Sequence, residues 1–298
     1  MDRLLAGQRN DFGFKTLRLE KRHPTEAPLI SVLVRVKNEA RALGAFLRSL
    51  EQQSIFPRME VIFLDSGSTD GTCEMLQSFP ASVYAIAPSE FSFGPTCNLV
   101  CSLATAPILC LASGHIEFVA PEALAEGVAL LRNAPRLAAA YYRQIPNEAL
   151  GASSYERAQL RWSFPPGPAP RRASHGKHAF SNAASLFRAD VWRQMPFPAV
   201  NGSEDFLWAE QLLEKGGELW YLPNLCVRHS HDEQPGDLHR RVLINVEARP
   251  QNLRSWKNVA KYMIGVAGAC MLCGAGPLEA LRYAHAHASA YMPRKGSR

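Results

Sequence analysis

The 298-residue sequence lacks a long hydrophobic run. Its longest uncharged stretch near the carboxyl end, residues 262–278, has 17 residues and is interrupted by four glycines and Pro277. A membrane-spanning helix needs about 20 mostly apolar residues. The opening string, MDRLLAGQRNDFGFK, also lacks the apolar core of a secretion signal. We therefore expect no membrane-spanning segment and a cytoplasmic location.

Cysteine is sparse, and its number, seven, is odd. Without a secretion signal, this predicts reduced thiols rather than a disulfide framework. Cys270 and Cys273 have the CxxC spacing, but no second such pair completes four zinc ligands, so we interpret them as packing residues. The sequence also lacks an HExxH motif, which disfavours a metal hydrolase built on His115, His229 and His231.

Acidic residues are scarce at one end of the chain. Residues 239–298 hold 10 Lys and Arg against 2 Asp and Glu, a net charge of +8, whereas residues 1–238 hold 23 against 25, a net charge of −2. The slightly acidic body disfavours nucleic acid as a partner. The basic tail suits an anionic membrane surface or a neighbouring subunit. The alternative is a set of helices that pack over the sheet with a solvated basic face.

The hydrophobic pattern alternates between strand and helix periods. Strand patterns at 31–36, 60–64, 83–87 and 108–112 alternate with helical patterns at 41–53, from 68, near 95–104 and at 121–132. Such alternation is typical of βαβ units. We therefore predict an α/β fold with a mainly parallel sheet sandwiched by helices and a helical carboxyl-terminal extension.

Polar segments follow three of the predicted strands. They cover residues 35–39, 65–72 and 113–115. Ligands of open parallel sheets bind outside the carboxyl ends of the strands, and a carboxylate there followed by Gly and Ser suits contact with a base or ribose. The alternative is that Asp65 and Asp70 only shape the turn and cap the next helix.

Two strings, VRVKNEARALGAFLRSLEQQS and EVIFLDSGSTDGT, carry a resemblance to a known family. Together with Glu204-Asp205 and the later HSH, they resemble the family-2 glycosyltransferases of GT-A fold over roughly residues 29–231. The HSH and FSFG segments are most similar to bacterial rhamnosyltransferase-like members. The resemblance implies an N-terminal extension at 1–28, a GT-A domain at 29–236 and a basic helical extension at 237–298.

The resemblance also implies a nucleotide-diphosphate sugar as donor, with UDP- and dTDP-sugars expected. In the family, the segment matching residues 35–39 and the acid matching Asp65 hold the nucleotide, and a stretch that includes the match to Asn98 lines the donor pocket. The implied donor-nucleotide residues are Arg35, Lys37, Asn38, Glu39, Asp65, Gly67, Ser68, Asn98, Ser113 and Gly114.

The metal motif departs from the family pattern. Most members carry Asp-x-Asp where this chain has Ser113-Gly114-His115. His229 and His231 match the position of a further ligand or a diphosphate contact. The resemblance thus implies a divalent cation, Mn²⁺ or Mg²⁺, at these three histidines, although imidazole is a poor ligand for Mg²⁺. The alternative is that the imidazoles donate hydrogen bonds to the phosphates without a metal.

The Pro-rich segment at 164–170 breaks the strand and helix pattern and predicts a functional loop. Basic residues follow it directly. We expect Arg171, Arg172 and Lys177 to supply charge to the donor diphosphate.

Sugar transfer with inversion needs a general base opposite a leaving diphosphate. Glu204 and Asp205 open a predicted helix, whose dipole lowers the pKa of carboxyls in the first turn. Such a pair is also an ordinary helix start. The resemblance maps the base onto Asp205 and binding of the acceptor or donor sugar onto Glu204. Trp208, one turn further on, either stacks on a sugar face or lies in the core.

These observations predict an inverting glycosyltransferase of the hexosyltransferase type. It moves a sugar to a hydroxyl of a glycan or lipid-linked acceptor in polysaccharide biosynthesis, with peripheral membrane contact or a homo-oligomer formed through the tail. The rival hypothesis is a catalytically inactive nucleotide-sugar-binding or scaffold protein that has lost the acidic metal motif.

Overall fold

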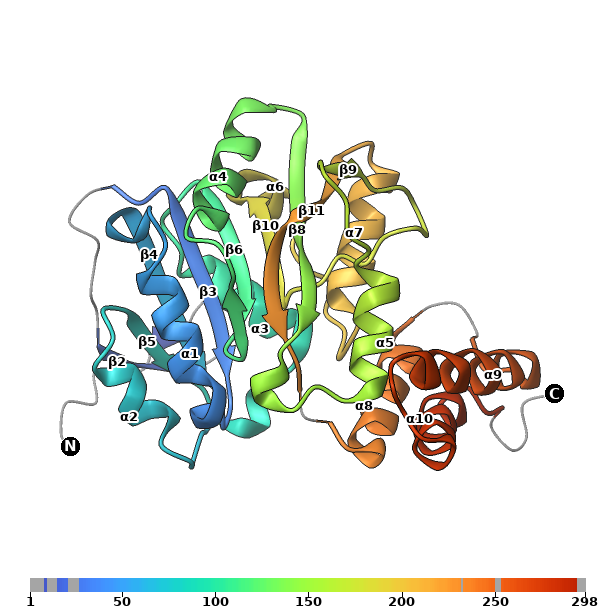
Figure 1. Ribbon diagram of the computed structural model, residues 1–298. Helices are drawn as coiled ribbons and strands as arrows, with labels where there is room; N and C mark the ends of the chain where they lie inside the picture. Colours follow the sequence, from blue (N-terminus) through green and yellow to red (C-terminus); the bar gives the residue numbers. More distant parts are fainter. Residues whose placement is uncertain (1–7, 10–14, 21–26, 232, 250–252, 294–298) are drawn as a thin grey trace. The chain divides into compact units, whose positions relative to one another are not determined.

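The computed structural model describes residues 8–9, 15–20, 27–231, 233–249 and 253–293 (Figure 1). Its strands are β1 (Gln8–Arg9), β2 (Lys15–Glu20), β3 (Ile30–Val36), β4 (Met59–Asp65), β5 (Ser82–Ala85), β6 (Ile108–Ser113), β7 (Ile116–Phe118), β8 (Leu137–Pro146), β9 (Arg171–Arg172), β10 (Ala184–Arg188) and β11 (Glu218–His229). Its α-helices are α1 (Ala40–Glu51), α2 (Thr72–Gln77), α3 (Phe93–Ser102), α4 (Ala123–Asn133), α5 (Ser154–Ser163), α6 (Ala189–Gln194), α7 (Glu204–Glu214), α8 (Pro235–Ala248), α9 (Trp256–Leu272) and α10 (Pro277–Ser289).

One sheet joins the strands in the order β1-β2-β5-β4-β3-β6-β10-β8-β11-β7, and β9 pairs with β11. Strands β5, β4, β3 and β6 are parallel to one another, and β10 runs antiparallel between β6 and β8. Alternate residues of β3, from Ile30 to Val36, pack in one core with the buried side chains of α1, α2 and α4. The intervening residues point to the other face, where α3 packs against β3 and β4. Figure 1 shows α1 and α4 in front of the sheet and α3 and α6 behind it.

The carboxyl ends of the parallel strands meet at one edge of the sheet. The register pairs Val36 with Asp65 and Arg35 with Ser113. Because β10 is antiparallel to β6, its first residue, Ala184, lies at the same edge. The arrowheads of β3, β8 and β11 point to this edge, at the bottom of Figure 1. The edge therefore gathers polar residues that lie far apart in the sequence.

The chain forms two compact units. The first holds the sheet up to Gln144, with residues 166–200 and 204–229, and the second holds residues 145–165, 201–203 and those from Ser230 onward. Helices α8 and α10 of the second unit, with parts of α5 and α9, share a hydrophobic core. Residues 145–165, assigned to the GT-A domain from the sequence, thus group with the tail. None of the described helices is long and apolar enough to cross a membrane.

The predicted α/β fold class, including the helical carboxyl-terminal part, is confirmed, and the cysteines are free thiols, as expected. One continuous strand, β11, covers residues 218–229. Strand β10 was not predicted, since its five residues after a turn give too short a pattern. Part of the expected N-terminal extension joins the sheet, where β2 pairs with β5.

Candidate active site

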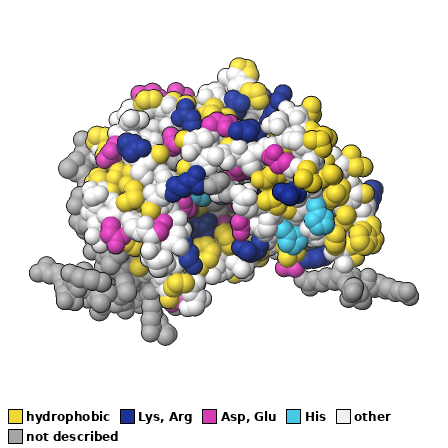
Figure 2. Space-filling model, turned by 60° about the horizontal axis from the view of Figure 1, so that its bottom comes forward, with side chains coloured by type: hydrophobic (Ala, Val, Ile, Leu, Met, Phe, Trp, Pro, Cys, Tyr) yellow, Lys and Arg dark blue, Asp and Glu magenta, His cyan; other side chains and the backbone are white. Residues whose placement is uncertain are grey.

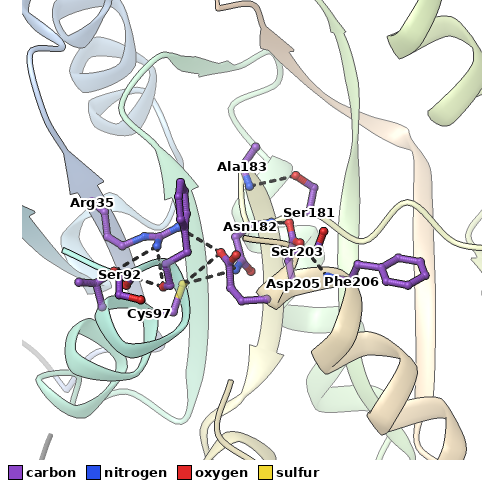
Figure 3. A network of polar contacts seen from close by, with 12 residues as sticks. Arg35, Ser92, Cys97, Ser181, Asn182, Ala183, Ser203, Asp205 and Phe206 are labelled. Atoms are coloured by element: carbon purple, nitrogen blue, oxygen red, sulfur yellow. Dashed lines mark hydrogen bonds and ion pairs between the residues drawn. The ribbon is translucent and has the colours of Figure 1, made fainter. Parts of the chain in front are cut away.

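Two neighbouring carboxylates, Glu204 and Asp205, begin α7 close to the start of β10 (Figure 3). Glu204 Oε1 accepts a hydrogen bond from Asn182 Nδ2 at 3.2 Å and lies 3.5 Å from Arg35 Nη2. Asp205 Oδ2 accepts from the backbone N–H of Asn182 at 3.2 Å, and its Oδ1 accepts from the N–H of Phe206 at 2.7 Å. Asn182 therefore ties both carboxylates to the edge of the sheet.

The environment of Asp205 changes its acidity. Its carboxyl is half-buried, and Glu204 beside it is 4% exposed. Burial, followed by the negative charge of Glu204, raises the pKa of Asp205 to about 7. The sequence-based prediction of a lowered pKa is wrong for this residue, because desolvation outweighs the backbone hydrogen bonds at the helix start. A carboxylate with a pKa near neutrality is suited to take a proton from a hydroxyl.

Arg35, predicted to contact the nucleotide, has its described contacts inside the protein. Its Nη1 donates to the carbonyl of Phe93 at 2.9 Å, and its guanidinium carbon lies 5.9 and 5.7 Å from the ring centroids of Phe91 and Phe93. The same guanidinium reaches Glu204. Arg35 therefore holds the start of α3 beside the carboxylate pair.

A second polar centre is a pair of stacked imidazoles. His115 immediately precedes β7, and His229 ends β11, which pairs with β7 so that His229 lies opposite Ile116. The ring centroids of the two histidines are 5.1 Å apart with 17° between the ring planes. Their Nε2 atoms face each other at 3.1 Å. Strand pairing thus converts two distant histidines into one site.

The far nitrogen of each ring is anchored. Glu39 Oε1 lies 2.9 Å from Nδ1 of His115, and Gln144 Oε1 lies 2.7 Å from Nδ1 of His229. A carboxylate only accepts, so Nδ1 of His115 carries a proton. The amide oxygen of Gln144 likewise accepts from Nδ1 of His229. The two Nε2 atoms therefore face each other, an arrangement that a shared proton or cation stabilises.

The donor set fits a transition-metal cation. Two nitrogens bound to one cation at about 2.1 Å are roughly 3.0–3.4 Å apart in octahedral or tetrahedral sites, which matches the spacing of His115 and His229. Metal-binding histidines usually donate their other N–H to a carboxylate or carbonyl oxygen, as both rings do here. His231 follows two residues later and belongs to the second unit, where its N–H donates to Glu156 Oε1.

Gly114 lies close to the side chain of Val36 and next to Glu39. A Cβ at Gly114 would lie 3.1 Å from Cγ1 of Val36 and 3.4 Å from Cγ of Glu39. The neighbouring Ser113 donates its backbone N–H to the carbonyl of Ala183 at 3.0 Å. Ser113 and Gly114, both predicted to bind the donor, therefore help to form the edge of the sheet.

The loop after β4 is held by its own side chains. Asp65 accepts hydrogen bonds from the N–H of Gly67 at 2.9 Å and from the N–H and Oγ of Ser68. The backbone N–H of Asn38, which has a φ of 55°, donates to the same Ser68 Oγ at 2.8 Å. The turn-shaping alternative thus describes the contacts of Asp65. Lys37, in the linked loop, is exposed.

Two side chains predicted to bind ligands belong to the core instead. Asn98 Oδ1 accepts from Trp192 Nε1 at 3.0 Å, and its Nδ2 donates to the carbonyl of Phe197 at 2.9 Å. Trp208 is 0% exposed and donates its Nε1–H to the carbonyl of Met195 at 2.6 Å. Internal contacts thus occupy the polar atoms of Asn98, which was predicted to contact the donor, and Trp208 takes the core position that was the alternative to a sugar contact.

Arg171 and Arg172, predicted to contact the diphosphate, lie far along β11 from the histidine pair. Strand β9 pairs at the start of β11, where Arg172 lies opposite Trp220 and its Nη2 reaches Glu218 at 3.0 Å. Nine residues of strand, about 30 Å, separate this point from His229. Lys177, by contrast, lies in an exposed turn next to Gly176, whose N–H donates to Glu210 on α7 at 2.8 Å.

Sequence reasoning missed Asn182 and Gln144. Gln144 ends a polar pair, Arg143-Gln144, after the apolar run of β8, and this change in polarity at a strand end was a usable signal. Asn182 precedes the unpredicted strand β10, so nothing in the pattern directed attention to it.

Comparisons with known proteins show the family of the chain. The model of glycosyl transferase family 2 matches residues 31–194, more than half of the chain, and the protein belongs to this family. The chain is 23% identical over 227 residues to the O-antigen chain rhamnosyltransferase WbaN of Salmonella anatum, covering 70% of this chain and 68% of that protein. It is 24% identical over 225 residues to RfbN of Salmonella typhimurium, an O-antigen chain rhamnosyltransferase, covering 71% and 69%.

Solved structures share the fold. The mannosyltransferase PcManGT of Pyrobaculum calidifontis, in complex with GDP-Man and Mn²⁺, matches with a TM-score of 0.54 at 19% identity, over 90% of this chain and 71% of that one. TarS 1-349 of S. aureus, in complex with UDP-GlcNAc, matches with a TM-score of 0.54 at 13% identity, over 88% and 90%. The protein is thus a family-2 glycosyltransferase with a GT-A fold.

Proposed function

We propose that the protein transfers a hexose with inversion from a nucleotide-diphosphate sugar to an acceptor hydroxyl, with Asp205 as the general base. The observation that carries the proposal is a half-buried carboxylate with a pKa of about 7, tied by Asn182 to the edge of the sheet where ligands of such folds bind. Near neutral pH this group is ionised in part and basic enough to accept the proton. The acceptor oxygen then bonds to the anomeric carbon as the bond to the diphosphate breaks.

The residues around Asp205 have supporting roles in this proposal. Glu204, held by Arg35 and Asn182, contacts the acceptor or donor sugar and keeps the pKa of Asp205 high through its negative charge. The donor nucleotide lies along the loops that follow β3 and β4, where Lys37 is the exposed cation. UDP- and dTDP-sugars are the proposed donors.

The stacked pair of His115 and His229 is the proposed cation site. When bound, a divalent cation there supplies positive charge to the leaving diphosphate. Mn²⁺ suits two imidazoles better than Mg²⁺ does. The Mn²⁺ in the mannosyltransferase structure and the nucleotide sugars in both solved relatives support this assignment.

The proposed acceptor is a glycan or a lipid-linked glycan in polysaccharide biosynthesis. The O-antigen rhamnosyltransferases among the relatives support this class of acceptor and make rhamnose the first sugar to test.

The test is a panel of nucleotide-diphosphate sugars, scored first by thermal shift with and without Mn²⁺ and then by release of the nucleoside diphosphate. We expect one UDP- or dTDP-sugar to raise the melting temperature most, and to do so more strongly with Mn²⁺. Proton NMR of the transferred sugar should show an inverted anomeric centre. Binding of a donor with neither hydrolysis nor transfer to any acceptor would instead support the rival, an inactive nucleotide-sugar-binding protein.

A further inference from the structure

Helix α9 is apolar on two opposite sides. On one side, Tyr262 and Val266 pack on the core of the second unit, in which Cys270 is buried. On the other side, Ile264 and Leu272 face solvent with 77% and 75% of their surface exposed. A surface helix of a protein in water normally carries polar side chains on its outer face. The outer side of α9 is therefore built for an apolar environment.

Neighbouring helices extend this surface. The apolar face, as we name it, consists of side chains that are each 49–77% exposed: Trp162 on α5, Trp256, Ile264, Met271 and Leu272 on α9, and Leu278 and Leu281 on α10. Trp162 and Leu272 line the same pocket, so α5 adjoins the end of α9. Figure 2 shows hydrophobic side chains gathered at the right, where Figure 1 draws α9 and α10. Such a cluster marks an interaction surface.

The charge on α9 identifies the kind of partner. Lys257 and Lys261 are exposed and fall within about 60° of Ile264 around the helix. Helix α9 has no acidic residue. The α9 of a second copy would therefore offer these lysines no carboxylate to pair with. Anionic headgroups neutralise them instead.

We infer that the apolar face binds the surface of an anionic lipid bilayer, with α9 lying in the plane of the interface. Ile264 and Leu272 enter the acyl boundary, and the tryptophans lie at headgroup level with the lysines. The 17 residues of α9 are about 25 Å long, which suits an in-plane helix. The inference stands on the second unit alone and does not rest on the proposed transfer reaction.

Flotation of the full-length protein with vesicles tests the inference. One set contains phosphatidylcholine only, and the other contains about 30% phosphatidylglycerol in addition. We expect binding to the anionic set that decreases with added salt, and far weaker binding to the neutral set. Joint substitution Ile264→Glu and Leu272→Glu should lower the partition coefficient about a hundredfold. Joint substitution Lys257→Gln and Lys261→Gln should lower it about thirtyfold.

Val119→Glu is the matched control. Val119 is a large hydrophobic residue of the first unit, 42% exposed, and its replacement should leave vesicle binding unchanged. Equal binding to both vesicle sets overturns the inference, as does wild-type binding by the Ile264→Glu, Leu272→Glu variant. Absence of vesicle binding, with a dimer in ultracentrifugation that this variant loses, assigns the face to a second copy and also overturns it.

Discussion

Nε2 of His115 and Nε2 of His229 face each other at 3.1 Å across adjacent strands, and Glu39 and Gln144 anchor the far sides of the two rings. The sequence Ser113-Gly114-His115 occupies the place of the usual Asp-x-Asp. In the proposed cation site, the paired nitrogens therefore come from the start of β7 and the end of β11 rather than from one acidic motif.

Glu39 should control the affinity of this pair for a cation. Glu39→Gln removes the carboxylate that fixes the tautomer of His115, and we expect Mn²⁺ to bind 10–100-fold more weakly. Titration followed by the electron paramagnetic resonance signal of free Mn²⁺ measures this. Glu51→Gln, an exposed change on the same helix, is the control. Equal affinities for Mn²⁺ in the Glu39 and Glu51 variants would show that Glu39 plays no part in cation binding.

The imidazoles should also select the metal. After a chelator has removed the bound metal and has itself been removed, we expect Mn²⁺ to restore turnover at lower concentration than Mg²⁺. The reason is that imidazole nitrogen is a softer ligand than oxygen and therefore favours Mn²⁺ over Mg²⁺. His229→Ala should lose this preference together with tight Mn²⁺ binding. If activity without any divalent cation equals the activity with Mn²⁺, the imidazoles act on the phosphates directly.

Asp205 should make stability depend on pH. Its pKa in the folded protein, about 7, lies above its value in the unfolded chain, so the free energy of unfolding falls as pH rises from about 4 to 7 and stays low above that. Asp205→Asn removes this dependence. We expect the variant to gain stability over the wild type between pH 4 and 7, measured by urea unfolding. A gain that is the same at pH 4 and pH 8 contradicts the raised pKa.

Trp208 should matter for stability and not for sugar binding. Its indole is fully buried, so Trp208→Ala should cost about 3–5 kcal/mol of the free energy of unfolding. Trp162→Ala, at an indole that is 63% exposed, is the matched control and should have little effect. A Trp208→Ala protein of normal stability with a raised KM would restore the sugar-stacking role.

The sequence predicted the alternating fold and the edge that carries the site, because strand and helix periods are local properties of the chain. It located Asp205 and His115 through their motifs. It left open whether Asp65 closes its own turn and whether Trp208 lies in the core, and it did not predict that Asn98 packs inside, because hydrogen-bond partners such as Ser68 and Trp192 are chosen by tertiary packing.

The position of Arg171 and Arg172 was not predictable for a similar reason. Basic character was visible in the sequence, but the pairing of β9 with the far end of β11 was not. The pKa of Asp205 was likewise not predictable from the sequence. The sequence predicted the start of the helix, whereas the burial that raises this pKa depends on the packed structure.

The central claim is that Asp205 takes the proton of the acceptor, and the pH profile of kcat with saturating donor and acceptor tests it most directly. Wild-type kcat should rise with pH and level off above about 7, as the carboxyl ionises. Asp205→Asn should lower kcat by about a hundredfold or more and abolish this rise, while donor affinity stays close to that of the wild type. Asp190→Asn, an exposed change in the first turn of α6, is the control and should behave as the wild type. An Asp205→Asn enzyme with wild-type kcat and an unchanged pH profile would contradict the account.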